Sequence, residues 1–175
     1  STEGGPRSGR FNAYTEAADG SPRYDWRITD RIFDTYLERG LKPYVQMGFM
    51  PEALSSNPHP YQHSWYPGGQ NSISTGWAYP PNDYRKWGDL THAWARHCAE
   101  RYGHEEASRW VWEVWNEPNI FYWRGTPEEY QTLYDYAVDG VKRALPGAPV
   151  GGPHIAGTNT PEAQQFMRDF LTHCV

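Results

Sequence analysis

The amino-acid sequence predicts an α/β fold, because segments with helical periodicity alternate with short apolar segments along most of its 175 residues. Three apolar segments are typical of strands: residues 41–50, 109–116 and 148–155. Four helical segments flank them, at about 25–39, 83–102, 126–145 and from 160 onward. This alternation predicts a parallel sheet whose strands are connected through helices.

The first helix and strand follow from spacing and from glycine placement. The apolar face of the helix is formed by Ile28, Ile32, Phe33, Tyr36 and Leu37. Gly40 is expected to end this helix as a C-cap residue. Residues 41–50 are almost continuously apolar, which is typical of a strand buried on both faces of a parallel sheet.

Clear start signals precede the later helices. Thr126 is expected to be an N-cap, with Pro127 at the first helical position and Glu129 completing a capping box. Thr160 and Pro161 give a similar start to the last helix. The predicted helix over 83–102 places five apolar residues on one face: Trp87, Leu90, Trp94, Cys98 and Tyr102.

Two segments lack these patterns. Residues 1–25 are rich in Gly, Ser, Pro and charged residues and are expected to be loop-like. Residues 51–81 form a connection of a length that usually carries a function. The aromatic residues of this connection, among them Trp65, Tyr66 and Trp77, favour an ordered segment.

Three strands are too few for a finished α/β domain. The two outer strands would leave backbone donors and acceptors unpaired. We therefore expect residues 1–175 to be part of a single (β/α)8 barrel domain, because a closed barrel of about 250 residues has no edge strands.

Composition excludes several classes of partner. The net charge of −5 argues against nucleic acid and anionic membranes, and no apolar run approaches the ~20 residues of a membrane span. Cys98 and Cys174 are expected to be buried free thiols, which leaves secreted and cytoplasmic locations equally open. Aromatic residues make up 16% of the chain, and such rings either fill cores or stack on sugars.

The stretch "WEVWNEPN", residues 112–119, places a carboxyl group where chemistry is expected. Glu117 ends an apolar strand, and Pro118 disfavours helical geometry at the residue before it. Catalytic groups of a βα barrel lie at the C-terminal ends of its strands. A carboxyl held among Trp112, Trp115 and Trp123 would be partly desolvated, as a general acid requires.

"WNEPN" at a strand end resembles the acid/base strand of retaining glycoside hydrolases with (β/α)8 barrels. Three further stretches resemble glycoside hydrolase family 39, the β-xylosidases: "YDWRITDRIFDTYLERGLKPYVQMGFMPEAL", "PPNDYRKWGDLTHAWARHCAERYG" and "VGGPHIAG". The resemblance runs in collinear order from about residue 14 onward. It implies a central portion of the barrel, about the third to fifth βα units.

The resemblance also implies roles for individual residues. Glu117 matches the general acid/base, and Asn116 matches the residue that contacts the sugar 2-hydroxyl. Trp123 falls where the family has an aromatic residue near the bound sugar, with helix packing as the alternative. Phe49 is expected in the pocket wall, and His154 is a further candidate for substrate contact.

Two departures from the family pattern matter. The nucleophile of the family is a second glutamate on a later strand, which would lie outside this chain. Gln46 stands where an acidic residue is expected in many relatives. Neither Glu113, about 13 Å down the strand from Glu117, nor Glu52 is a convincing nucleophile, because retaining enzymes need ~5–5.5 Å between their carboxyl groups.

These observations predict a retaining hydrolase that acts on β-xylosides or xylo-oligosaccharides, with no cofactor and no metal. An α-L-iduronidase-like enzyme is the alternative within the family, with Arg124 as the local candidate for binding a uronate. A carbohydrate-binding barrel without catalytic activity is the alternative from another class. A self-associating half-barrel, and hence a homo-oligomer, is a third.

Overall fold

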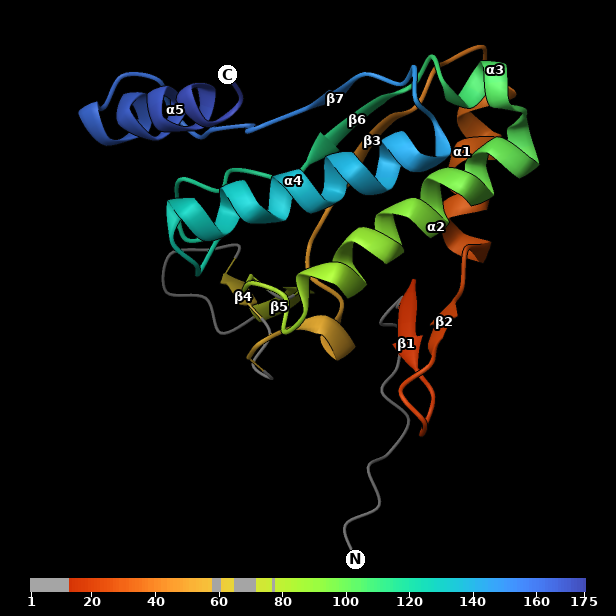
Figure 1. Cartoon of the computed structure of the whole chain (residues 1–175), viewed down its shortest axis with the longest axis horizontal. Helices are drawn as coiled ribbons and strands as arrows, with labels where there is room; N and C mark the ends of the chain where they lie inside the picture. The colour runs from red at the N-terminus through yellow and green to blue at the C-terminus, as the bar shows by residue number, and fades with distance from the viewer. Residues whose placement is uncertain (1–12, 58–60, 65–71, 77) are drawn as a thin grey trace, which may run out of the picture.

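In this computed structural model, which describes residues 13–57, 61–64, 72–76 and 78–175, three parallel strands form the central sheet (Figure 1). Their order is β3-β6-β7, with bounds Tyr44–Met47, Val111–Val114 and Val150–Gly151. The register places Gln46 opposite Glu113, and Glu113 opposite Gly151 on the other side. The parallel sheet and its three strands are therefore confirmed.

The four predicted helices are also confirmed. They are α1 (Arg27–Leu37), α2 (Tyr84–Tyr102), α4 (Pro127–Ala144) and α5 (Pro161–His173). A short helix that the sequence did not predict, α3 (His104–Ala107), follows α2. At the start of α4, Glu129 N–H donates to Thr126 Oγ1 (3.2 Å) and Thr126 N–H donates to Glu129 Oε2 (2.7 Å), which completes the predicted capping box.

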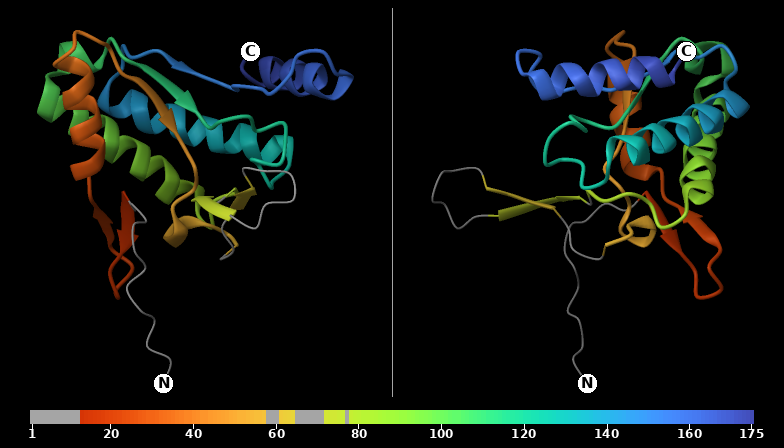
Figure 2. Two further views of the ribbon diagram at one scale, coloured as in Figure 1. Left: turned by 180° about the vertical axis from the view of Figure 1, so that it is seen from behind. Right: turned by 60° about the vertical axis from the view of Figure 1, so that its left-hand side comes forward.

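Helices α2 and α4 cover one face of the sheet only (Figure 2). Val45 and Met47 point toward these helices and are buried. Tyr44 is 60% exposed and Gln46 is exposed, because they point to the opposite face. The expectation of a continuously buried strand at β3 is therefore wrong for this chain, since the described residues pack against a single face of it.

The apolar face of α1 is only partly buried. Phe33 lies in the core, with its ring edge-on to Trp110 at 5.2 Å. Ile28, Ile32 and Tyr36 are exposed. The helical spacing identified the element correctly, while three of its five apolar residues are only partly covered within the described part of the chain.

The cysteines differ from each other. Cys98 is a buried free thiol on α2, and burial raises its pKa. Cys174 is also free but exposed, because it lies just beyond the last residue of α5. The expectation that both are buried is thus right for Cys98 and wrong for Cys174.

Two antiparallel hairpins lie in segments that the sequence marked as loops. Strands β1 (Tyr14–Glu16) and β2 (Pro22–Tyr24) pair within the stretch expected to be loop-like. Within the long connection, a 3-10 turn (Glu52–Leu54) precedes strands β4 (Tyr61–Ser64) and β5 (Ser72–Gly76). Strands this short carry too few apolar residues for alternation to show. Trp65, Tyr66 and Trp77 lie outside the described residues. None of the described helices has the length and apolar character that a bilayer span requires.

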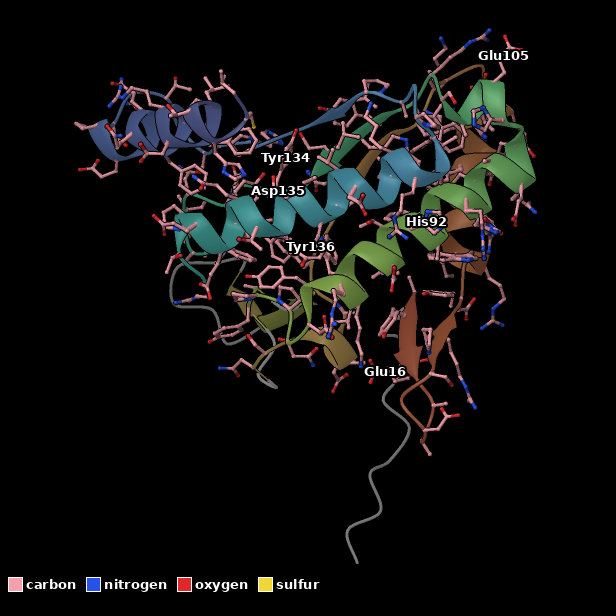
Figure 3. The ribbon with its side chains drawn as sticks, in the orientation of Figure 1. Glu16, His92, Glu105, Tyr134, Asp135 and Tyr136 are labelled. Atoms are coloured by element: carbon pink, nitrogen blue, oxygen red, sulfur yellow. The ribbon has the colours of Figure 1, made fainter. Side chains whose placement is uncertain are left out.

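Helices α2 and α4 approach each other closely at two glycines, Gly88 and Gly140. A Cβ atom on Gly140 would lie 2.1 Å from Thr91 Oγ1 and 2.4 Å from the Gly88 carbonyl oxygen. Figure 3 shows His92 where the two helices lie side by side, and its Nδ1 is 3.2 Å from the Gly140 carbonyl oxygen.

We predict that Gly140→Ala destabilises the protein by up to about 2 kcal/mol. Overpacking costs about 1–3 kcal/mol and outweighs the ~1 kcal/mol that alanine gains over glycine in a helix. Gly147→Ala is the matched control, because a Cβ there would meet nothing within 4 Å. Urea unfolding midpoints measure both changes. Equal stability of the two variants would contradict the close helix contact.

The β1–β2 hairpin is attached to α2 by an ion pair, Lys86 Nζ to Glu16 Oε1 at 2.8 Å. This hydrogen bond from Lys86, together with one from the Tyr14 hydroxyl, lowers the pKa of Glu16 below 4.5. A carboxyl group with a lowered folded-state pKa stabilises the protein above its unfolded pKa, and this contribution is lost as the pH falls through the folded value.

We therefore predict that Glu16→Gln reduces stability at pH 7 by less than about 1 kcal/mol, since the pair is partly exposed. The difference from wild type should shrink as the pH falls below 4.5 and vanish once Glu16 is protonated. Urea unfolding across this range checks the prediction. In a Lys86→Met background the same substitution should have a smaller effect. A difference that persists at low pH would refute the assignment.

Candidate active site

The segment that follows β6 is held between the ends of its two neighbouring strands. Trp115 N–H donates to the Met47 carbonyl at the end of β3, at 2.8 Å. Glu117 N–H donates to the His154 carbonyl beyond β7, also at 2.8 Å. Trp115 and Glu117 both have positive φ angles, 71° and 48°, which cost about 1–3 kcal/mol each in non-glycine residues. Fixed backbone partners on both sides hold this turn in place.

Glu117 lies at the C-terminal edge of the sheet and is half-buried. Within the described part of the chain, its carboxyl group forms no hydrogen bond and no ion pair. Asn119 secures the turn after it, because its side chain donates to the Ala156 carbonyl and accepts from the Ala156 N–H, both at 2.8 Å. The carboxyl group is thus presented on a fixed backbone.

Three tryptophans were expected around this carboxyl group, and the structure places one of them, Trp112, on the other side of the sheet. The Trp112 ring lies edge-on to Trp94 of α2 at 5.9 Å, so it belongs to the helical side of the sheet. Trp115 is fully buried and donates through Nε1 to the Tyr122 carbonyl at 3.0 Å.

Trp123 is 5% exposed, and its Nε1–H donates to the Thr126 carbonyl at 2.9 Å. Its ring lies edge-on to Trp115, with centroids 5.1 Å apart. The contacts of Trp123 are those of a helix-packing residue, the alternative considered for it. We therefore leave it out of the proposed sugar contacts.

Phe49 lies two residues after the end of β3 and is partly buried. Its ring lies edge-on to Trp115 (5.3 Å) and stacks on Tyr122 (5.6 Å, 28° between planes). The sequence did not single out Tyr122, although it lies next to Trp123. Met50, the residue after Phe49, is buried.

Glu113 lies on the open face of the sheet, where its side chain is held by three residues. It accepts hydrogen bonds from the Tyr44 hydroxyl (3.1 Å) and from Gln46 Nε2 (2.8 Å). Burial, and next the Glu113 charge, raise the pKa of Tyr44, which keeps its hydroxyl protonated as a donor. His154 Nδ1 is 3.5 Å from Glu113 Oε2.

The structure therefore brings Asn116, Gln46, Glu113 and His154 together. Gln46 Nε2 also contacts Asn116 Oδ1 at 3.4 Å. Glu113 is buried, and the sequence did not identify Tyr44 as its partner. Tyr44 could have been found from the alternation of side chains along β3, because it lies on the same face of the strand as Gln46. Among the described residues, no group of three or more His, Cys, Asp or Glu is arranged to hold a metal ion.

Comparison with known proteins identifies the family. The family described as "Glycosyl hydrolases family 39" matches residues 8–175. The chain belongs to glycosyl hydrolase family 39. A β-xylosidase of Geobacillus stearothermophilus is 39% identical over 155 residues, which are 87% of this chain and 28% of that enzyme. A β-xylosidase of Caldicellulosiruptor saccharolyticus is 41% identical over 140 residues, 79% of this chain and 27% of that enzyme.

Comparison of this family 39 chain with solved structures also finds a β-xylosidase. A monomeric β-xylosidase from Caulobacter crescentus CB15 superposes with a TM-score of 0.74 at 32% identity, over 90% of this chain and 29% of that one. The chain thus spans less than a third of the length of these relatives. Its fold is a portion of a (β/α)8 barrel, as the alternation of elements predicted. Human α-L-iduronidase matches more weakly, at 32% identity over 51% of this chain and 14% of that enzyme.

Tyr130 of α4 supports the strand that carries the site. Its buried hydroxyl donates to the Val114 carbonyl at 2.9 Å, directly before the turn with positive φ angles. We predict that Tyr130→Phe destabilises the protein by about 1–3 kcal/mol, because a buried carbonyl loses its partner. Tyr134→Phe is the matched control, since its bond to the Val150 carbonyl is long, 3.4 Å (Figure 3). Thermal unfolding of both variants tests this, and equal losses would contradict it.

Proposed function

We propose that this chain contributes the acid/base half of the active site of a retaining glycosidase that hydrolyses β-xylosides. The observation that carries the proposal is the Glu117 carboxyl group, which lies at the C-terminal edge of a family 39 sheet and has no partner within the described residues. The β-xylosidases named above, at about 40% identity, support xylosides as the substrate class.

In the first step of the proposed reaction, a glutamate outside these residues attacks the anomeric carbon. Glu117 donates its proton to the departing glycosidic oxygen, so the bond to the leaving group breaks as the glycosyl-enzyme bond forms. In the second step Glu117, now a carboxylate, takes a proton from water as the water oxygen attacks the anomeric carbon. The glycosyl-enzyme bond breaks, which frees the nucleophile as a carboxylate and releases the sugar with retained configuration. Two carboxyl groups and water suffice, so no step needs a cofactor.

Glu113 is not suited to be the nucleophile. Both of its oxygens are engaged, Oε1 by Tyr44 and Oε2 by Gln46. It also lies within β6, four residues before Glu117, which lies in the turn beyond the strand, whereas a retaining pair needs ~5–5.5 Å between the two carboxyl groups. The nucleophile is therefore proposed to come from another strand of the barrel.

The remaining proposed contacts surround Glu117. Asn116 meets the sugar 2-hydroxyl, His154 lies across the strand ends on the β7 side, and Phe49 forms the wall on the β3 side. A hydrogen bond to the 2-hydroxyl that strengthens in the transition state contributes several kcal/mol in glycosidases of this kind. The family 39 relationship covers these residues in one continuous match.

The test is Glu117→Ala in the protein with its complete barrel. With xylobiose, whose leaving group needs protonation, we expect kcat/KM to fall by about 10²–10⁴. With a dinitrophenyl xyloside, whose leaving group departs without an acid, the glycosyl-enzyme should form in a burst and then hydrolyse slowly. Azide should restore turnover and yield a β-xylosyl azide, because azide attacks without a general base.

Glu162→Ala, at an exposed position in the first turn of α5, is the matched control and should leave all rates unchanged. Equal losses with both leaving groups, or no response to azide, would overturn the role of Glu117. Xyloside binding without hydrolysis by the unmodified protein would favour a carbohydrate-binding barrel. Preference for an iduronide would favour the iduronidase alternative.

A further inference from the structure

We propose that Gln46 and Glu113 are positioning residues that fix which end of the Asn116 side-chain amide faces the sugar. The inference rests on the proposed function and deepens it, because it assigns the preference for a 2-hydroxyl to residues that act through Asn116. Three neighbouring positions on the open face of the sheet carry it.

Strand register brings these residues together. Gln46 of β3 lies directly opposite Glu113 of β6, and Asn116 follows three residues later at the strand end. Gln46 Nε2 is 2.8 Å from Glu113 Oε2 and 3.4 Å from Asn116 Oδ1. One amide nitrogen therefore bridges the buried carboxylate and the proposed sugar-binding amide.

The chemistry of these groups permits one arrangement. An ionised carboxylate only accepts hydrogen bonds, so the Gln46 amide must turn its NH2 group toward Glu113. The second hydrogen of that NH2 group is donated to Asn116. The acceptor in the Asn116 side chain is its amide oxygen, Oδ1. The Asn116 NH2 group is then directed away from Gln46. It has no hydrogen-bond partner among the described residues, so it can donate to a sugar hydroxyl.

Glu113 is itself well fixed, which makes it a suitable reference point. It is 7% exposed, and its other oxygen accepts from the Tyr44 hydroxyl at 3.1 Å. Its neighbour in β7 is Gly151, which has no side chain to compete for the carboxylate, and His154 Nδ1 approaches Oε2 to 3.5 Å. A buried carboxylate without such partners would be strongly unfavourable.

The experiment measures Gln46→Met in the complete enzyme with two substrates, a dinitrophenyl β-xyloside and its 2-deoxy analogue. Methionine keeps the length of the side chain but removes the donor. We expect kcat/KM to fall about 10- to 100-fold for the xyloside and less than about threefold for the 2-deoxy analogue. Asn116→Ala should show the same dependence on the 2-hydroxyl, and adding Gln46→Met to it should cause little further loss.

Glu113→Gln provides a second variant, because an amide at this position no longer dictates the orientation of Gln46. It should show the same selective loss with the xyloside. Gln164→Met, on the exposed side of α5, is the matched control and should leave both substrates unaffected.

Equal losses with both substrates in Gln46→Met and Glu113→Gln would overturn the inference and indicate a purely structural pair. Undiminished xyloside turnover in both variants would overturn it as well. These outcomes are separate from failure of the proposed function, which the Glu117 variant reveals with xylobiose and azide in the presence of an intact Gln46.

Discussion

The arrangement of the site depends on two backbone hydrogen bonds. They run from Trp115 N–H to the Met47 carbonyl and from Glu117 N–H to the His154 carbonyl, so the end of β6 is fixed to both neighbouring strands. Each lies at a residue with positive φ, where an unsupported chain would relax to a more favourable conformation. The backbone at Glu117 is therefore fixed by its neighbours, and in the proposed reaction this lowers the entropic cost of bringing the carboxyl group to the reacting oxygen.

Much of the fold could be predicted from the sequence, because its signals are local. The helix starts at Thr126 and Thr160 are encoded by caps and prolines, and the parallel strands by short apolar segments between helices. The β1–β2 hairpin could not be predicted, since three-residue strands are too short for alternation to be visible. Continuous burial of β3 was also wrong, because burial depends on what covers each face, and Tyr44 faces a side that the described residues leave open.

The residues of the candidate site also fall into two groups, those that the sequence identified and those that only the structure revealed. Asn116 and Glu117 were singled out from a motif. The sequence placed Glu117 at the end of an extended strand, whereas β6 ends at Val114 and Glu117 lies in a turn with a positive φ angle. The partners of Glu113 could not be predicted, because they depend on the register between β3 and β6, which the sequence alone does not determine. The sequence suggested that Trp123 stacks on a sugar. In the structure it is buried and hydrogen-bonded to Thr126, and these properties depend on packing that the sequence alone does not reveal.

The alternation of side chains along β3 divides the effects of substitution along a single strand. Val45 and Met47 contribute to the core beneath the helices, while Tyr44 and Gln46 point to the face that carries Glu113 and Asn116. A change at Val45 or Met47 therefore alters core packing, whereas a change at Tyr44 or Gln46 alters the hydrogen bonds around Glu113 and leaves the core intact. The polar face of this strand can thus be redesigned at every second position without repacking the domain.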